Sequence, residues 1–496
     1  MPKACGHCAA RIAPPEISRG DGMAVILRDY QEEMIVRARE KMRTKRRILY
    51  QLPTGGGKTA IAAFMISEAV AKGKVIWFIC HRNELVAGTS ATLRKYGVPH
   101  GIIAAGYPMD IRQSVQVCSI DTLKNRMHQL PPPDLIIWDE CHHVAAAGWA
   151  RVMENYPKSY HVGLSATPIR LDGKGLDEHF DEMICGPSME WLMEHGHLAQ
   201  YLLFSPGGPD MKGVRKAMGD FSKSQTAERA DKPKLIGDML KHWTAQAFGK
   251  RTVAFGVNRA HSVHIAETFA AAGIPFAHLD GDTDKAERVK AIQAFARGEL
   301  VGLSNVALFG EGFDLAAIAQ MDVTIDCVID AAPTMSLSSY MQRGGRMLRP
   351  APNKIGVYLD HAGNSDRHGY FEDEREWTLS GMERRGGGGA NDNGPPPPKT
   401  CGNCFLQVRQ PVPPACPHCG AELRQAPKAI EVEAGELREI SADDRKRQRD
   451  QNKREQSECK TLGELTALGV RRGYKSPQQW AYKIWCSRMA RRPAVA

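Results

Sequence analysis

One stretch of the chain has the residue types and the order that a phosphate-binding loop needs. It reads Gln51-Leu-Pro-Thr-Gly-Gly-Gly-Lys-Thr59, follows a short apolar run and precedes a helical pattern. Glycines let backbone N–H groups approach phosphate oxygens, and the N-terminus of a helix favours an anion. The lysine would reach the β- and γ-phosphates, and the last threonine would bind Mg²⁺. The predicted nucleotide contacts are Thr54, Gly55, Gly56, Gly57, Lys58 and Thr59.

The loop alone also fits an ordinary glycine-rich turn, because Leu52 stands where the strict motif has glycine. A second motif decides between the two interpretations. The apolar run 134–139 ends in the adjacent carboxylates Asp139 and Glu140. At the carboxyl end of a parallel strand, Asp139 can hold Mg²⁺ and Glu140 can polarise the attacking water. The two motifs together predict a site for ATP and Mg²⁺.

Short apolar runs alternate with longer amphipathic stretches between residues 24 and 365. Runs rich in β-branched and aromatic residues are typical of parallel strands buried on both faces. Two series of such runs predict an α/β fold with two tandem parallel-sheet domains. We place their join near residues 195–235, where a Gly/Pro-rich turn and a lysine-rich stretch interrupt the pattern. The runs include 74–80, 134–139 and 161–165, followed by 252–255, 301–304, 323–329 and 355–359.

These motifs make the chain resemble the superfamily 2 helicases of the DEAD/DEAH class over residues 26–365, which implies RecA-like domains. Gln31 stands where that family reads adenine, and residues 52–59 resemble its motif I. Asp139-Glu-Cys-His142 occupies the place of the DEAD or DEAH box, with a cysteine that departs from both names. Ser165-Ala-Thr167 is similar to motif III, which couples hydrolysis to domain movement in the family.

The second half of the chain has its own matches to the family. The segment with Gly312 and Asp314 resembles motif V, and residues 342–349 resemble motif VI. The resemblance implies that Arg346 and Arg349 are arginine fingers and that Gln342 lies near the catalytic water. The glycine loop and the fingers would then lie on different domains, so activity would require closure of one domain on the other.

Nucleic-acid contacts are also implied by the resemblance. Segments 80–85 and 119–123 resemble motifs Ia and Ib, which contact strand phosphates in the family. The predicted contact residues are Arg82, Thr122, Ser165 and Thr167. Residues 165–188 and 473–482 further resemble a subgroup common in phage and prophage genomes.

Six of the thirteen cysteines form C-x-x-C pairs, and the other seven stand singly. Cys401, Cys404, Cys416 and Cys419 have the spacing of a zinc ribbon, in which two turns complete a tetrahedron around one ion. Reduced thiols on a disordered tail are the alternative. Cys5 and Cys8 have no second pair nearby, so they are half of another metal site or belong to an extension before a start at Met23.

The predicted organisation follows from these features and from two changes in composition. Residues 1–23 are an extension without an ordered role, 24–200 and 201–381 are the two RecA-like domains, and 382–399 form a Gly/Pro linker. The zinc ribbon takes 400–424. Residues 425–496 are a basic helical tail, because 441–496 hold fourteen Lys and Arg against six Asp and Glu. Such a tail favours phosphate backbones, although a solvated tail without a partner is the alternative.

The composition and charge of the chain indicate where the protein acts and what it binds. Apolar residues make up 42% of the chain and its net charge is +10, and it has neither a bilayer-length apolar run nor a secretory signal. We therefore expect a cytoplasmic protein with no membrane partner. Its expected partners are nucleic acid, DNA before RNA, and replication or recombination proteins.

Three functions compete at this point. The first is an ATP-dependent DNA helicase. The second is a duplex translocase that remodels bound proteins or branched DNA without separating strands. The third is a nucleic-acid-binding scaffold in which ATP only switches affinity, and Glu140, Arg346 and Arg349 argue against it because a switch without turnover needs none of them.

Overall fold

The computed structural model describes residues 25–144, 147–170, 174–217, 219–306, 308–309, 315–381, 398–423, 442–474 and 476–489. Cys5, Cys8, Gly312 and Asp314 lie outside these residues, as does nearly all of the predicted linker. The chain divides into one unit that ends at residue 424 and a second that begins at 425.

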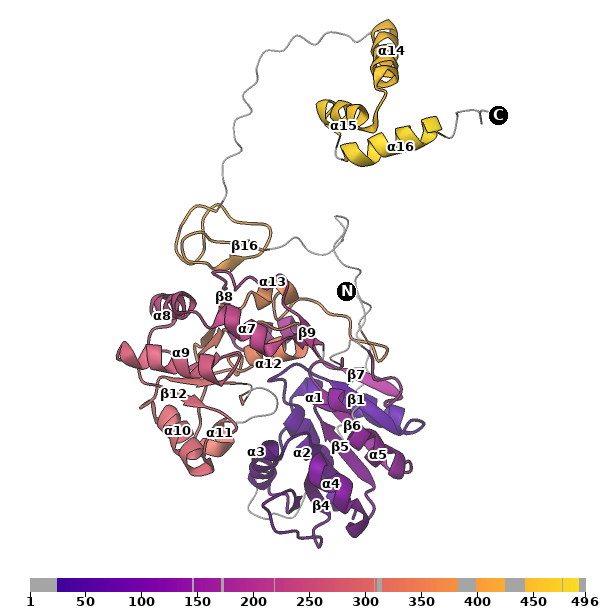
Figure 1. Cartoon of the computed structure of the whole chain (residues 1–496). Coiled ribbons are helices and arrows are strands. Elements are labelled where there is room, and N and C mark those ends of the chain that lie inside the picture. The colour runs from indigo at the N-terminus through magenta and orange to yellow at the C-terminus, as the bar shows by residue number, and fades with distance from the viewer. Residues whose placement is uncertain are drawn as a thin grey trace, which may run out of the picture. The chain divides into compact units, whose positions relative to one another are not determined.

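The first unit contains two parallel sheets, which confirms the predicted α/β fold (Figure 1). The sheet of the first lobe has seven strands in the order β3-β4-β2-β5-β6-β1-β7. They are β1 (Arg47–Gln51), β2 (Ile76–Cys80), β3 (Gly101–Ile103), β4 (Val115–Ser119), β5 (Leu135–Asp139), β6 (Tyr160–Ser165) and β7 (Glu182–Cys185). The helices of this lobe are α1 (Asp29–Met42), α2 (Lys58–Ala71), α3 (Asn83–Lys95), α4 (Ile120–Arg126), α5 (Ala147–Asn155) and α6 (Met189–Glu194). Two short 3-10 helices, η1 (Met127–Gln129) and η2 (Cys141–His143), complete it.

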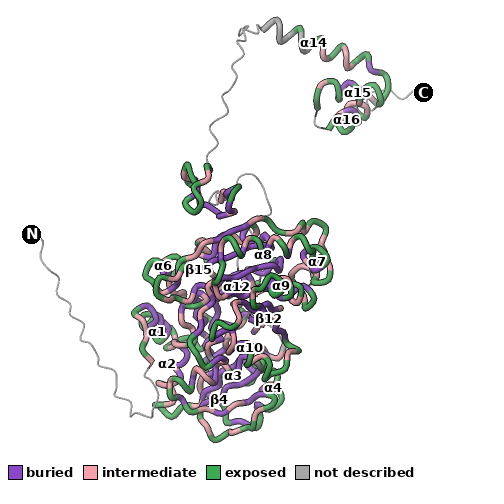
Figure 2. The backbone as a smooth tube through the Cα atoms, turned by 90° about the vertical axis from the view of Figure 1, so that its left-hand side faces the viewer, coloured by how far each residue is buried: buried purple, intermediate pink, exposed green. Residues whose placement is uncertain are grey.

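Alternate residues of the first sheet enter two separate cores. Tyr50 and Phe78 pack with α1, α2 and α3 on one face. Leu49, Trp77 and Trp138 pack with α4 and α5 on the other face. Successive side chains of a strand point to opposite faces, so helices on both faces explain why these strands are apolar throughout. Figure 2 shows the strands as the most buried part of the first unit.

The sheet of the second lobe has six parallel strands in the order β12-β13-β11-β14-β15-β8. They are β8 (Gln200–Phe204), β11 (Thr252–Phe255), β12 (Phe276–Leu279), β13 (Gly302–Asn305), β14 (Cys327–Asp330) and β15 (Ile355–Asp360). A separate hairpin pairs β9 (Lys216–Ala217) with β10 (Asp220–Phe221). The helices are α7 (Lys223–Ala230), α8 (Pro233–Ala247), α9 (Arg259–Ala271), α10 (Lys285–Arg297), α11 (Leu315–Ala319), α12 (Leu337–Gly345) and α13 (Asn364–His368).

One sequence prediction is narrowed in this lobe and another needs correction. The join, predicted near residues 195–235, lies at the start of that range, because β8 begins at Gln200 and already pairs with β15 of the second sheet. The strand expected at 323–329 begins only at Cys327. Val323 and Ile325 are buried although they lie before the strand, so this apolar run reflects packing of a loop as well as of a strand.

The cysteine-bearing segment packs on the second lobe as part of its core. Its two short strands are β16 (Lys399–Thr400) and β17 (Gln407–Val408). Leu406, Val408 and Leu423 share one apolar cluster with Phe204 and Trp243 of the lobe. The backbone N–H of Ser205 also donates to the carbonyl oxygen of Phe405, at 2.9 Å. The segment therefore completes one face of the second sheet.

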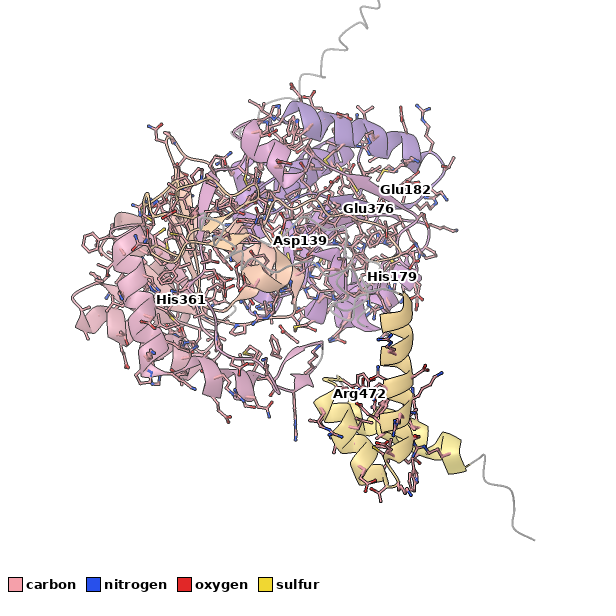
Figure 3. All side chains as sticks on the ribbon, turned by 90° about the horizontal axis from the view of Figure 1, so that it is seen from above. Asp139, His179, Glu182, His361, Glu376 and Arg472 are labelled. Carbon is pink, nitrogen blue, oxygen red and sulfur yellow. The ribbon has the colours of Figure 1, made fainter. Side chains whose placement is uncertain are left out.

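The second unit contains α14 (Ala442–Glu458), α15 (Leu462–Arg471) and α16 (Pro477–Met489). Leu465, Leu468 and Ala481 form its small core, against which Trp480 and Trp485 pack. Arg472, marked in Figure 3, ties the turn after α15 to α14 through Glu455, at 2.8 Å. None of the described helices combines the length and the apolar character that a bilayer crossing requires.

The two ends of the cysteine-bearing segment provide a test of this architecture. A chain that stops after Arg424 should unfold at the same temperature as the first unit of the full chain. A chain that stops after Gly381 should melt about 5–10 °C lower, because it exposes the apolar face that Leu406, Val408 and Leu423 cover. Calorimetry of both truncated chains measures the difference. Equal melting temperatures would contradict the shared core.

Candidate ATPase and metal sites

The carboxyl ends of three neighbouring strands bring the predicted ATPase residues together. β1 lies beside β6, and β6 lies beside β5, with Gln51 opposite Ser165 and Asp139 opposite Leu164. The glycine loop follows β1 and Glu140 follows β5. Both motifs therefore emerge at the same edge of the sheet, where ligands bind in open α/β folds.

The glycine loop is shaped by close contacts that a side chain would prevent. Gly57 caps α2 with a φ of 89°, and a Cβ there would lie 2.3 Å from Nε2 of Gln31. A Cβ at Gly56 would lie 2.7 Å from Cγ of Leu52. Leu52 is fully buried, so the residue that departs from the strict motif fills the space beneath the loop.

Gln31 is tied to the glycine loop. Its amide donates to the carbonyl oxygen of Gly56 at 3.0 Å and accepts from the N–H of Arg28 at 3.0 Å. The hydroxyl of Tyr30 donates to the same Gly56 oxygen at 2.8 Å. Lys58 is half-buried with its Nζ 3.4 Å from the carbonyl oxygen of Leu52, whereas Thr59 is exposed. The structure thus places these predicted nucleotide contacts around one loop.

Glu140 has a backbone conformation that non-glycine residues rarely adopt, with a φ of 49°. Such strain costs about 1–3 kcal/mol and is common at functional sites. The conformation buries Glu140, and its Oε2 lies 3.5 Å from Nδ1 of His142. Asp139 is half-buried at the end of β5 and is marked in Figure 3.

Cys141, the residue that departs from the family's box, is part of the core. Its sulfur lies 2.8 Å from the position that a Cβ on Gly163 would take, so it packs tightly against β6. Burial raises the pKa of its thiol well above the ordinary value, and the charges of Glu140 and Asp139 add to the rise. A neutral, enclosed thiol does not take part in the chemistry.

A line of polar contacts runs from Glu140, through His142, to the second lobe. Nδ1 of His142 lies 3.2 Å from Oγ of Ser165, which also accepts from the N–H of Thr167 at 3.2 Å. The Thr167 hydroxyl donates to Oγ of Ser338 on α12 at 2.8 Å. Nε2 of Gln342 donates to the same Ser338 oxygen at 3.4 Å. These side chains link motif III directly to motif VI.

Ser165 and Thr167, which were predicted to contact nucleic acid, do not present their hydroxyl groups to solvent. Both residues are buried, and both hydroxyl groups bond within the protein. Thr167 bonds Ser338 of the second lobe, whereas Ser165 bonds His142 and Thr167 within the first lobe. Arg82 is exposed and Thr122 is half-exposed. Arg82 follows β2 and Thr122 follows β4. These two strands are paired, and their last residues, Cys80 and Ser119, are opposite each other.

The C-terminal end of α12 packs against the glycine loop. A Cβ on Gly345 would lie 2.6 Å from Cγ2 of Thr54. Arg346 follows immediately and is half-buried, as is Arg349. Arg343 is held elsewhere, because it bonds Oδ1 of Asp330 at 2.9 Å. Arg343 thus has a structural bond within the second lobe, which residue type alone does not reveal.

The four cysteines of the ribbon lie close enough to share one ion. Their sulfur atoms are all within 4.8 Å of one another, and the pairs Cys401–Cys419 and Cys404–Cys416 are each 3.7 Å apart. A tetrahedral Zn²⁺ with Zn–S bonds of about 2.3 Å separates its sulfurs by about 3.8 Å. His418, between two of the cysteines in the sequence, bonds elsewhere, with its Nε2 2.7 Å from Oε1 of Gln246.

Comparison with known proteins agrees with this geometry. Residues 24–170 match the family model "Type III restriction enzyme, res subunit", and residues 231–351 match "Helicase conserved C-terminal domain". The chain is 32% identical over 333 residues to a 51.5 kDa protein of a Lactococcus phage, an alignment that covers 66% of this chain and 68% of the phage protein. The chain belongs to the superfamily 2 helicases.

Two further relatives have more descriptive names. A putative ATP-dependent helicase of Saccharomyces cerevisiae, IRC3, is 30% identical over 350 residues, covering 66% of this chain and 50% of the yeast protein. The DNA 3'-5' translocase XPB2 of Sulfurisphaera tokodaii is 26% identical over 369 residues, covering 65% of this chain and 78% of the relative. The chain thus spans only half of the yeast helicase.

Two residues of this site were missed by the sequence analysis. His142 and Ser338 connect the acid pair to α12, yet neither was assigned a role. His142 lies in the family's box, where its position was a usable signal. Ser338 lies four residues before Gln342, one helical turn away on α12. Its role follows only from the structure, in which it accepts hydrogen bonds from Thr167 of the first lobe and from Gln342.

The bond between the lobes should contribute to turnover. Ser338→Ala removes the acceptor of both Thr167 and Gln342, and a hydrogen bond of this kind is worth about 0.5–1.5 kcal/mol. We expect kcat for ATP hydrolysis to fall about 3–10-fold, with KM for ATP nearly unchanged. Steady-state kinetics measures both, with Ser339→Ala on the same helix as the control. Equal losses in the two variants would argue against the assigned bond.

Proposed function

We propose that this protein is an ATP-dependent helicase or translocase that moves along or unwinds DNA. The observation that supports this most is the contact of α12 with the glycine loop, where Gly345 meets Thr54. The hydrogen bond between Thr167 and Ser338 lies in the same interface. The two halves of the ATPase site thus come from different lobes, so the state of the nucleotide can control the distance between the lobes.

The proposed reaction divides the work between the lobes. Lys58 binds the terminal phosphates, and Thr59 and Asp139 would hold Mg²⁺, which neutralises phosphate charge when bound. Glu140 orients the attacking water. Arg346 and Arg349 stabilise the negative charge of the transition state from the second lobe, and Gln342 lies beside the water. After hydrolysis the arginines lose their partner, the lobes separate, and the bound strand is advanced.

DNA is the proposed substrate because a named relative that aligns over most of its own length is a DNA translocase. Arg82 and Thr122, in the segments that follow two paired strands, are the proposed contacts to the strand phosphates. Such contacts give affinity without reading sequence. The predicted replication or recombination partners and the cytoplasmic location stay predictions.

The C-terminal unit is proposed as a second grip on nucleic acid. It carries most of the chain's excess of positive charge, and counterion release from phosphates favours binding to such a surface. Tyr474 and Tyr482 expose 42% and 60% of their surface, although tyrosine is usually more buried. Exposed aromatic rings on a basic surface are suited to stacking on bases.

Zinc is the ion proposed for Cys401, Cys404, Cys416 and Cys419. Their separations fit a tetrahedral site with four thiolates.

The substrate is identified by stimulation of ATP hydrolysis. Single-stranded DNA, duplex DNA, forked DNA and RNA are compared at equal nucleotide concentration, and we expect DNA to stimulate most. Strand displacement from the fork would establish a helicase. Displacement of a bound protein from intact duplex without strand separation would establish a translocase. No stimulation by any nucleic acid would contradict the proposed function.

Glu140→Gln should separate binding from hydrolysis. The variant keeps the size and position of the side chain but cannot polarise water, so we expect ATP affinity within two-fold of the wild type and kcat lower by about 10²–10⁴-fold. Lys58→Ala is the companion variant and should lose ATP affinity as well. Equilibrium binding of a labelled nucleotide and ATPase rates provide the measurements. A Glu140→Gln variant with near-normal turnover would contradict the assigned role.

A further inference from the structure

A short acidic segment contacts both the cysteine-bearing ribbon and α12, the helix that the predicted arginine fingers follow. It comprises residues 370–376, which follow α13 and include Glu372, Asp373, Glu374 and Glu376. Glu376 is marked in Figure 3. The segment lies at the edge of a cavity of about 330 Å³ that Thr54 of the glycine loop and Met341 of α12 also line. It is therefore next to the ATPase site of this unit.

The ribbon holds this segment through one side chain, Arg409. Its guanidinium lies 2.8 Å from Oε1 of Glu372 and 2.9 Å from Oδ1 of Asp373. It also lies over the ring of Tyr370, 4.0 Å from the centroid. A planar guanidinium bonds two carboxylates and stacks on a ring at the same time, which an ammonium group does not do.

The acidic segment has its own internal support. The guanidinium of Arg375 donates to four carbonyl oxygens, those of His368, Tyr370, Phe371 and Asp373, at 2.7–3.0 Å. Glu372 is also the acceptor for the hydroxyl of Tyr201. The segment is thus a compact turn that Arg375 holds together from within, and Arg409 of the ribbon contacts it from outside.

The turn packs directly on the helix of the predicted fingers. The ring of Phe371 stacks on Tyr340 of α12 with centroids 4.7 Å apart. A Cβ on Gly344 would lie 2.1 Å from Cζ of Phe371, so the outer end of the ring occupies the space that a side chain at position 344 would need. The next residue, Gly345, meets Thr54, and Arg346 follows. Three adjacent contacts therefore lead from Arg409 to the glycine loop.

The chain beyond the turn continues to the first lobe. The carbonyl oxygen of Leu379 accepts from the N–H groups of Leu176 and Asp177 at 2.6 and 3.1 Å. The acidic segment is therefore attached to the second lobe at Phe371 and leads to the first lobe at Leu379. A change in its position would alter how α12 meets the glycine loop.

We propose that Arg409 is a positioning residue for the ATPase site and that metal binding by the ribbon controls turnover through it. The ribbon has few residues, so its metal fixes the backbone that presents Arg409. Loss of the metal releases Glu372 and Asp373, loosens Phe371 on α12 and displaces Arg346. The ribbon is then an internal regulator of the ATPase. The kinetic part of this proposal rests on the proposed function.

Arg409→Ala tests the proposal in the full-length protein. We expect kcat for DNA-stimulated ATP hydrolysis to fall about five-fold, with KM for ATP and a content of about one zinc per chain unchanged. Hydrogen exchange should become faster in residues 370–373 and in α12. His418→Ala is the matched control, because it removes another contact of the ribbon with the second lobe, to Gln246, away from the acidic segment. The control should leave kcat and exchange unchanged.

The outcomes separate this proposal from the proposed function. Wild-type kcat and wild-type exchange in Arg409→Ala would overturn the positioning role. Equal losses in Arg409→Ala and His418→Ala would reduce the ribbon to a general stabiliser and would also overturn it. If the wild type shows no DNA-stimulated hydrolysis, the proposed function fails, and the exchange of α12 still decides whether Arg409 positions it. Glu372→Gln removes the same ion pair from the other side, should Arg409→Ala fold poorly.

Discussion

The contact between Gly345 and Thr54 is the constraint on which the ATPase site depends. In the proposed assignment neither lobe contains all the charges that phosphoryl transfer needs, so the proposed site exists only where α12 meets the glycine loop. A side chain at position 345 would come within 2.6 Å of Thr54 and force the lobes apart. The absence of a Cβ therefore allows a helix that ends in arginines to approach a loop that is shaped for phosphates.

A polar line crosses the same interface and explains how the two lobes sense each other. His142, Ser165 and Thr167 lead from the acid pair to Ser338 and Gln342. Because these groups are buried, each lost partner would leave an unsatisfied polar atom, which is costly in a low-dielectric interior. The bond between Thr167 and Ser338 therefore stabilises the arrangement in which the two lobes meet.

The sequence predicted what depends on local pattern and missed what depends on packing between distant segments. The glycine loop, the acid pair and the two parallel sheets follow from runs of a few residues. The sequence predicted a boundary after residue 200, and β8 of the second sheet begins at Gln200, but no local signal marks the pairing of β8 with β15, about 150 residues away. Thr167 was predicted to touch a strand, since motif resemblance does not show that its hydroxyl is buried against Ser338. The cysteine spacing predicted a metal site, but only the structure shows that the segment is part of the second lobe's core.

The measurement that tests the central claim most directly is the turnover of Arg346→Ala compared with its nucleotide affinity. An arginine finger stabilises only the transition state of ATP hydrolysis. If Arg346 is such a finger, Arg346→Ala should lower kcat by about 10³-fold and keep the Kd for ATP within a few-fold of the wild type. Arg343→Ala, which breaks the bond to Asp330 instead, is the comparison for a structural effect and should lower the melting temperature. A near-normal kcat in Arg346→Ala, or a defect confined to ATP binding, would contradict an ATPase site shared between the lobes.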